Sequence, residues 1–305
     1  MTVYDLPAPA KLNLFLHVVG QRADGYHLLE SLFRLISLAD SISIDLRLDG
    51  QISRESNLGV EVNPDDDLVV RAARLLQQRT GVLHGAHLHV TKRIPVGGGL
   101  GGGSSDAATV LIGLNRLWRT GLNRQELAML GLSLGADVPF FVFGQTAFVQ
   151  GVGEKLESFL APDSSYLIFR PPVSVPTAAI FKADDLTRNS DRVKISDFSG
   201  VGSFVNVASG QYGFGRNDLE PVAKRLFPIV SDAMTWVSQQ GYAVRLSGSG
   251  SCFFAEFNDP VQAELARGSL TGKMEKVDNG EVAVIKEVFA CDGLPEHPLR
   301  HWLTD

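Results

Sequence analysis

Hydrophobic and polar positions recur along the chain with two different periods, which predict a mixture of strands and helices. Alternating positions, and short apolar runs bounded by turn residues, predict strands at 11–19, 41–48, 86–92, 147–150, 166–169, 252–257 and 282–290. Apolar residues at helical spacing predict helices at 68–77, 104–118, 124–134, 177–182 and 260–267, with two more between 218 and 240. We therefore expect an α+β protein whose second half has helices on one face of a mostly antiparallel sheet.

The order of these elements suggests two domains. A short strand at 147–150 ends the first half, and we place the boundary near 155, which gives predicted domains 1–155 and 156–305. Two stretches do not fit a regular element, because 198–215 is rich in glycine and serine and 265–283 is polar and extended. We expect both of them to be loops.

Composition narrows the class of protein. The 305 residues are 44% hydrophobic, have a formal net charge of −6 and contain no long run of Lys or Arg. This disfavours nucleic-acid binding, which needs clustered positive charge. Cys252 and Cys291 lie in apolar stretches and are too few for a disulfide framework or a four-ligand zinc site. Because no stretch reaches ~18 consecutive apolar residues and no signal-peptide pattern is seen, we expect a cytoplasmic protein that does not enter a membrane.

The most informative stretch is IPVGGGLGGG at 94–103, where six of the last seven residues are glycine. It lies between a predicted strand and a predicted helix that begins with Ser104, Ser105 and Asp106, which are residue types that cap helices well. Glycines let the backbone approach a ligand closely, and a helix N-terminus offers unpaired N–H groups and partial positive charge. This combination predicts phosphate binding, and a flexible surface turn is the alternative.

Three common phosphate-binding motifs do not fit this loop. Gly97, Gly99 and Gly102 match the dinucleotide pattern G-x-G-x-x-G, but a second helix follows the first instead of the strand that this fold requires. The sequence has no P-loop signature G-x-x-x-x-G-K-[ST], and it lacks the V-A-I-K and H-R-D signatures of protein kinases. Another class of phosphate-binding protein is indicated.

The loop and its flanks, IPVGGGLGGGSSDAA, resemble the phosphate loop of the GHMP kinases, a family that includes galactokinase and the homoserine, mevalonate and phosphomevalonate kinases. Further segments extend the resemblance over most of the chain: PAPAKLNLFLHV at 7–18, RADGYHLLESLF at 22–33, LGADVPFF at 134–141, RNDLEPVA at 216–223 and RLSGSGSCFFAEF at 245–257. The first two resemble the branch of the family that acts on 4-diphosphocytidyl-2-C-methyl-D-erythritol.

This resemblance implies a fold and an activity. The fold would be the two-domain GHMP kinase fold, with an N-terminal domain like domain 2 of ribosomal protein S5, a ferredoxin-like C-terminal domain and the active site between them. The activity would be phosphorylation, by ATP with Mg²⁺, of the 2-hydroxyl of this small cytidyl diphosphate substrate, a step of the non-mevalonate isoprenoid pathway. The enzyme would be a monomer or a homodimer.

The resemblance also implies roles around the reacting atoms. Asp137 would be the base that takes the proton from the attacking hydroxyl, and Lys11 would keep Asp137 ionised and stabilise developing negative charge. Taken alone, Asp137 would be interpreted as a turn or helix-capping aspartate and Lys11 as a lysine on an edge strand. The residues that would cradle the ATP phosphates are Pro95, Val96, Gly97, Gly98, Gly99, Leu100, Gly101, Gly102, Gly103, Ser104 and Ser105. The Ser105 hydroxyl would lie nearest to Mg²⁺.

Substrate contacts are implied in the same way. The implied residues are Asn13, Tyr26, His27, Thr177, Phe181, Gly248, Ser249 and Gly250. Asn13 shares a strand face with Lys11 by the period of two. Tyr26 and His27 would recognise the cytosine by stacking and hydrogen bonds, with Phe181 on the opposite wall, and the triplet at 248–250 would close the site from the second domain. Without the resemblance, that triplet would be a plain turn.

Two further features bear on charge and metal binding. Asp106 stands where the family usually has asparagine, and we expect it to cap the helix or meet a cation and to point away from the γ-phosphate. His87 and His89 alternate with apolar residues and therefore share one face of a strand. Because no acid or cysteine accompanies them or His84 nearby in the sequence, we interpret them as part of a solvent-facing strand and not as a metal site.

Two other functions remain open. Another GHMP kinase with an altered substrate would share the glycine loop, but mevalonate has no base for Tyr26 and His27 to recognise. A nucleotide-binding regulator without catalysis would need neither Lys11 nor Asp137. The presence of Tyr26 and His27 favours the cytidyl substrate over mevalonate. The presence of Lys11 and Asp137 favours an enzyme over a regulator without catalysis.

Overall fold

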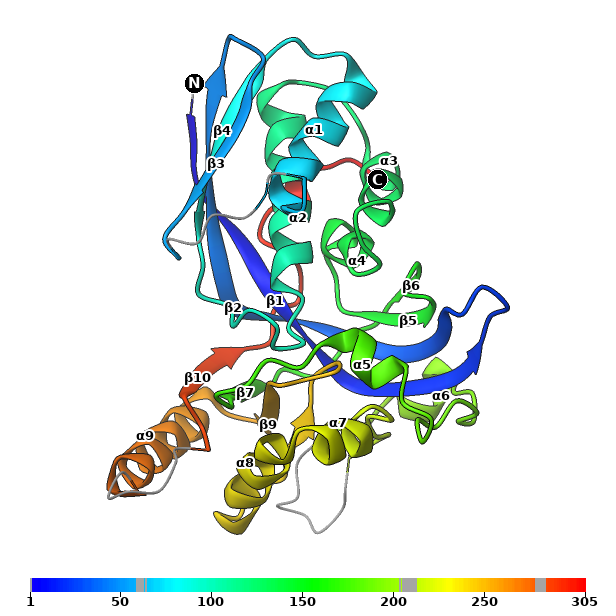
Figure 1. Cartoon of the computed structure of the whole chain (residues 1–305), viewed down its shortest axis with the longest axis vertical. Coiled ribbons are helices and arrows are strands. Elements are labelled where there is room, and N and C mark those ends of the chain that lie inside the picture. The colour runs from blue at the N-terminus through cyan, green and yellow to red at the C-terminus, as the bar shows by residue number, and fades with distance from the viewer. Residues whose placement is uncertain (1, 59–62, 64, 203, 205–212, 278–283) are drawn as a thin grey trace.

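The computed structural model describes residues 2–58, 63, 65–202, 204, 213–277 and 284–305. The chain forms two β-sheets, each with helices, and a long hairpin connects them (Figure 1). Among the described residues, no helix combines the length and apolar character needed to cross a bilayer.

The first sheet is built around the long antiparallel hairpin of β1 and β2. Its strand order is β3-β4-β2-β5-β6, with β1 paired to β2, and β3 and β4 are its parallel pair. The strands are β1 (Thr2–Gln21), β2 (His27–Arg47), β3 (Ile52–Ser56), β4 (Gly85–Thr91), β5 (Ala147–Gly151) and β6 (Lys155–Ser158). Bulges interrupt the β1–β2 register at several points, which allows so long a hairpin to bend.

Helices cover one side of this sheet (Figure 1). They are α1 (Leu68–Thr80), α2 (Gly102–Leu117), α3 (Arg124–Leu132) and α4 (Val138–Phe143). Asp67 caps α1 by accepting a hydrogen bond from Val69 N–H, and Asn123 forms a capping box with Glu126 at the start of α3. Helix α2 is buried along most of its length and forms the centre of the core. The glycine loop at its start is therefore attached to a helix that is packed into the core along most of its length.

The second sheet is antiparallel, with strand order β10-β7-β9-β8. Its strands are β7 (Ser165–Arg170), β8 (Arg245–Leu246), β9 (Phe253–Phe257) and β10 (Glu287–Asp292). The helices of this half are α5 (Thr177–Phe181), α6 (Ile195–Phe198), α7 (Glu220–Leu226), α8 (Pro228–Gln239) and α9 (Pro260–Val277). A separate core of β7, β9, α7, α8 and α9 residues holds this half together.

The two halves share buried contacts along β1. Leu12 and Leu14 belong to one apolar cluster with Ile168 of β7 and Phe254 of β9. Further along β1, the Leu16 N–H donates to the Arg216 carbonyl, and the Leu16 carbonyl accepts from Asp218 N–H. Strand β1 therefore belongs to the first sheet and also supports the second half.

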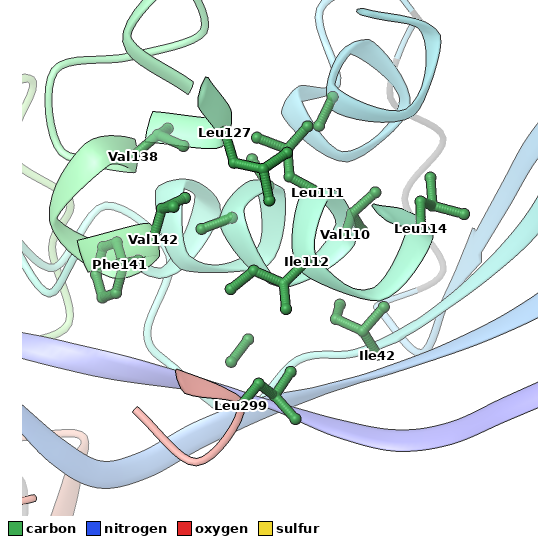
Figure 2. Packing of buried hydrophobic residues seen from close by; sticks show 14 of the residues in the cluster. Ile42, Val110, Leu111, Ile112, Leu114, Leu127, Val138, Phe141, Val142 and Leu299 are labelled. Carbon is green, nitrogen blue, oxygen red and sulfur yellow. The ribbon is translucent and has the colours of Figure 1, made fainter. Parts of the chain in front are cut away.

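The C-terminal tail returns to the first half. After β10, Leu294 N–H donates to the Leu35 carbonyl of β2, and Leu299 and Leu303 join the core around α2. Figure 2 shows Leu299 below Ile112 of this helix. The short 3-10 helix of the tail spans Arg300–Trp302. The domain boundary near residue 155 stays a prediction. That prediction assigned all of 156–305 to the second domain, whereas the tail after β10 packs on the first half.

Most predicted elements are present, but several have other bounds, and β3, α4, β6 and α6 were not predicted. The stretch 41–48 is the second part of one strand, β2, that begins at His27. The prediction of an extended loop at 265–283 is wrong up to Val277, because α9 continues to that residue, and the rest lies outside the described residues. Burial of Ala263, Ala266 and Leu270 at helical spacing explains the longer helix. Half of 198–215 lies outside the described residues, and within the described part Phe198 ends α6.

The histidines on β4 also differ from expectation. His87 and His89 do share a face, with ring centroids 4.4 Å apart. No acid lies near them in the sequence, but Glu55 of β3 and Asp45 of β2 lie beside them in the structure. These acids come from other strands, so their proximity is not visible as spacing in the sequence.

Candidate active site

Lys11 and Asn13 meet on one face of β1. The Lys11 ammonium donates to the Asn13 amide oxygen at 2.6 Å, and the two residues are 4% and 1% exposed. The Lys11 backbone N–H donates to the Leu100 carbonyl at 3.0 Å, so the glycine loop pairs with this edge of β1. Strand β1 is an edge strand, because among the described strands it pairs only with β2, but Lys11 does not protect an exposed edge: its side chain is buried and its backbone N–H is bonded to the glycine loop.

Asp137 occupies the position before α4, and its carboxylate faces Lys11. The Asp137 side chain makes no capping hydrogen bond to the helix. Its Oδ2 instead lies 3.7 Å from the Lys11 ammonium, and its side chain is 33% exposed. The two residues predicted to act at the reacting hydroxyl are thus brought together from positions 126 apart in the chain, and the carboxylate keeps contact with solvent.

The Lys11 ammonium has three compensating neighbours. Burial lowers the pKa of Lys11, while the charge of Asp137 opposes that shift. The ammonium also lies 4.4 Å from the centre of the Phe33 ring, in a cation–π contact. Held by a carboxylate, an amide oxygen and a ring, this cation is positioned before any substrate arrives.

The glycine loop contacts the second glycine turn directly. Cys252 N–H donates to the Gly98 carbonyl at 3.1 Å, and the Ser247 hydroxyl donates to the Gly99 carbonyl at 3.1 Å. A Cβ on Gly99 would lie 2.1 Å from the Ser247 carbonyl oxygen, and Gly99 has a φ of +75°. Glycine is required there by close approach and by backbone conformation together. These contacts come from Ser247 and Cys252, which flank residues 248–250, and the closing of the site by that triplet stays a prediction.

The glycine loop is the short connection between β4 and α2. Val96 is exposed and Leu100 is buried, which anchors the loop in the middle. Ser105 is fully buried, and its hydroxyl donates to the Pro9 carbonyl at 2.7 Å, which holds the first turn of α2 against β1. Its role near Mg²⁺ stays a prediction.

Asp106 meets a cation, as expected. Its carboxylate accepts from the Lys92 ammonium at 2.6 Å, and the same ammonium contacts Asp40 at 2.5 Å. Asp40 also accepts from the N–H groups of Arg93 and Ile94. This buried network joins the end of β4 to α2, so both ends of the glycine loop are fixed. Lys92 is occupied by two carboxylates and is not directed at a phosphate.

The residues predicted to bind the cytosine gather at the turn between β1 and β2 and at α5. The His27 ring lies 4.9 Å from the Phe181 ring, centre to centre. The Thr177 and Ser249 hydroxyls are 2.8 Å apart, which links α5 to the glycine turn of the second half. Tyr26 is 64% exposed, so its ring is available to a ligand. Their contacts with substrate remain predictions.

Two supporting residues were missed. Arg188 donates to His27 Nε2 at 3.1 Å and to the Phe181 carbonyl at 3.2 Å, and so connects the two rings. Asn217 donates to the carbonyls of Leu246 and Gly248, both at 2.8 Å, and so shapes the second glycine turn. Asn217 lies in the segment RNDLEPVA, which could have indicated it, whereas no sequence pattern marks Arg188.

Comparison with known proteins agrees with this geometry. Family models for the GHMP kinases N terminal domain and the GHMP kinases C terminal match residues 67–145 and 193–276. A protein of Bordetella bronchiseptica named 4-diphosphocytidyl-2-C-methyl-D-erythritol kinase is 55% identical over 307 residues, covering 100% of both chains. One of Aromatoleum aromaticum with the same name is 47% identical, covering 98% of this chain and 96% of its own.

A solved structure extends the comparison to the fold. The crystal structure of 4-(cytidine 5'-diphospho)-2C-methyl-D-erythritol kinase is 33% identical, with a TM-score of 0.77 over 96% of this chain and 99% of the other. The predicted α+β fold of the GHMP kinases is thereby confirmed. The chain belongs to the 4-diphosphocytidyl-2-C-methyl-D-erythritol kinases of the GHMP kinase family.

Proposed function

We propose that this protein transfers the γ-phosphoryl group of ATP to the 2-hydroxyl of 4-diphosphocytidyl-2-C-methyl-D-erythritol, which yields the 2-phosphate and ADP. The observation that carries the proposal is the Asp137 carboxylate 3.7 Å from the Lys11 ammonium, beside a glycine loop that pairs with β1 at Lys11. Full-length similarity to kinases named for this substrate supports the same conclusion.

In the proposed reaction, the substrate hydroxyl oxygen forms a bond to the γ-phosphorus while the bond from that phosphorus to the ADP oxygen breaks. The hydroxyl proton passes to the Asp137 carboxylate, which is partly exposed and free of a capping hydrogen bond. Lys11 keeps Asp137 ionised and stabilises negative charge in the transition state. Phosphoryl transfer requires mainly positioning and charge neutralisation, so this small set of groups is chemically sufficient.

ATP would bind with its phosphates at the glycine loop. Gly97, Gly99 and Gly101 all have positive φ, which lets the backbone turn closely around an anion. The 16-residue helix α2 begins directly after them and offers N–H groups and partial positive charge. A side chain on Gly101 would contact Phe141 and Lys11, so the loop and the catalytic lysine lie against each other.

Mg²⁺ is part of the proposal because a divalent cation neutralises the β- and γ-phosphates in reactions of this kind. Such an ion is usually held by substrate phosphates, waters and only one or two protein oxygens. We propose Ser105 for one of them, although its hydroxyl is fully buried and donates to the Pro9 carbonyl here, so the side chain would have to rotate away from Pro9 to reach the ion. We propose a cytoplasmic enzyme, where ATP is supplied, that works as a monomer or homodimer.

The cytidyl end of the substrate would lie at the other side of the site. Tyr26 offers an exposed ring for stacking, and His27 and Phe181 form a second aromatic surface that Arg188 holds in place. Thr177 and Ser249 add hydroxyls between this surface and the second glycine turn. The residues that would distinguish this substrate from mevalonate are therefore separate from those that act on the phosphate.

The test is ADP release from ATP and Mg²⁺ with three alcohols offered in parallel: the cytidyl-methylerythritol substrate, mevalonate and homoserine. Turnover with the cytidyl substrate alone is expected. Turnover with another alcohol instead would keep the glycine loop and the Lys11–Asp137 pair but reject the roles of Tyr26, His27 and Phe181. ATP binding without turnover of any alcohol would favour a nucleotide-binding regulator.

A further inference from the structure

A cluster of imidazoles and carboxylates lies on the face of the first sheet opposite Ala86, Leu88 and Val90, which pack in the core with residues of α1 and α2. Asp45 of β2 pairs in register with His87 of β4, and Glu55 of β3 pairs with His89 of β4. Three adjacent strands thus bring these four side chains to one face. Residues between them, such as Leu88, point to the core.

The distances within the cluster are short. His89 Nδ1 lies 2.7 Å from Glu55 Oε1, and His89 Nε2 lies 2.8 Å from Asp45 Oδ2. His87 Nε2 lies 3.7 Å from Glu55 Oε2. One nitrogen of each histidine and one oxygen of Glu55 all lie within 4.8 Å of one another. Two imidazole nitrogens and one carboxylate that converge in this way are the donor set of a transition-metal site.

We propose that Glu55, His87 and His89 bind a divalent transition metal, of which Zn²⁺ is the best match, while Asp45 holds the other ring nitrogen of His89. Zinc takes imidazole nitrogen and carboxylate oxygen at about 2.0–2.2 Å in tetrahedral geometry. Atoms within 4.8 Å of one another reach that geometry by small side-chain rotations, because the backbones are fixed by the sheet. The hard cations Mg²⁺ and Ca²⁺ prefer all-oxygen sites and match less well.

Neighbouring groups already orient His87 for this role. Its Nδ1 contacts the Ser53 hydroxyl at 2.7 Å, which directs Nε2 toward Glu55. A partner on the second ring nitrogen that fixes the ring is characteristic of histidine metal ligands. Arg47 lies near, donating to Ser53, but its charge is paired with Asp49 at 2.5 Å. The cluster itself therefore carries two carboxylates that a divalent cation would neutralise.

The alternative is a hydrogen-bonded surface patch in which His89 is held between two carboxylates without any metal. The side chains of His87 and His89 are 28% and 36% exposed, so solvent and a metal ion can both reach them. A bound metal would link β3, which is at the edge of the sheet, to β4. It would therefore raise thermal stability, which a patch without metal affinity would not show. None of the four residues belongs to the proposed active site.

The experiment uses the full chain without a histidine tag, treated with a chelator and then titrated with zinc sulfate. Calorimetry gives stoichiometry and affinity, thermal denaturation gives the change in Tm, and Co²⁺ absorption reports tetrahedral coordination. The variants are His87→Ala, His89→Ala and Glu55→Gln. The matched control is His84→Ala, which removes an exposed histidine just before β4 and outside the cluster.

One zinc per chain, a higher Tm with zinc and a tetrahedral Co²⁺ spectrum are expected for the wild type and for His84→Ala. Each of the three cluster variants should bind zinc at least tenfold more weakly. Absence of zinc binding by the wild type would overturn the proposal. So would unchanged affinity in the cluster variants, or a loss of affinity in His84→Ala as large as theirs. Equal affinity for Mg²⁺ and Zn²⁺ in the wild type would also overturn it.

Discussion

The ammonium of Lys11 on β1 lies 3.7 Å from the carboxylate of Asp137 at the start of α4, and the same ammonium donates to Asn13 at 2.6 Å. Lys11→Met keeps the apolar stem in its buried position but removes the charge that faces the reacting hydroxyl. We expect kcat to fall by about 10²–10³-fold, the loss typical of a preorganised electrostatic group. Steady-state kinetics with the cytidyl substrate measure it, with Lys155→Met on β6 as an exposed control.

If Lys11→Met retained a kcat within about threefold of the wild type while circular dichroism was unchanged, the electrostatic role of Lys11 would be rejected. A loss confined to the KM of the substrate would instead assign Lys11 to ground-state binding.

Gly99→Ala should disturb the contact between the two glycine turns. A Cβ there would lie 2.1 Å from the Ser247 carbonyl oxygen, so the loop must move. Because displacement by ~1 Å can reduce rates about 10²-fold, we expect a loss of that size in kcat/KM for ATP. Gly121→Ala is the matched control: its φ of +73° is nearly that of Gly99 at +75°, but its Cβ would meet nothing within 4 Å. Equal losses in both variants would show that backbone strain alone, and not the contact, is responsible.

Tyr26→Ala tests the recognition of the base. The side chain is 64% exposed, so its removal should leave the fold intact. We expect the KM of the cytidyl substrate to rise about tenfold or more, since stacking on a base contributes ~1–3 kcal/mol, with the KM of ATP unchanged. Tyr4→Ala removes another exposed tyrosine, 70% exposed, and should affect neither constant. Equal losses for both substrates in Tyr26→Ala would reject the stacking role.

His297 should make stability depend on pH. Burial, and then the charge of Arg124, lower the pKa of His297 to about 4. Because the unfolded chain binds the proton with an ordinary pKa near ~6.5, stability is complete above that pH and is lost as pH falls toward 4. The loss is about 3 kcal/mol. His297→Asn can still accept the hydrogen bond from Leu299 N–H and should flatten this dependence in denaturant unfolding between pH 4 and 7.

The exposed His301 of the same tail provides the control variant His301→Asn. Parallel stability curves for the wild type and His297→Asn would contradict the assignment. His297 lies in the C-terminal tail that packs on the first half, and its backbone N–H donates to the Gly144 carbonyl. A flattened curve would therefore also support a contribution of this tail packing to stability.

The sequence predicted those parts of the fold that have a regular period. Helices α1, α2 and α3 and strand β4 appear near their predicted bounds because each buries one face or one core stripe. Helix α4 was missed because its residues Val138 to Val142 are buried on all sides and show no period. Helix α9 was predicted too short because polar residues surround its few buried positions.

The site could be predicted only by residue type and resemblance, because its geometry depends on long-range contacts. No local pattern in the sequence indicates that Lys11 contacts Asp137, or that Ser247 lies too close to Gly99 for a side chain at that position. The contact between Glu55 and His89 was missed for the same reason: β3 and β4 pair in parallel across the intervening helix α1, and spacing in the chain does not reveal it.

The central claim is that Asp137 accepts the proton of the substrate hydroxyl, and a single-turnover measurement of ADP formation by Asp137→Asn tests it most directly. Asparagine is nearly isosteric and keeps α4 in place but cannot accept the proton. The account predicts a rate about 10²–10⁴-fold below the wild type, with ATP affinity in equilibrium binding unchanged. A single-turnover rate close to that of the wild type would contradict it.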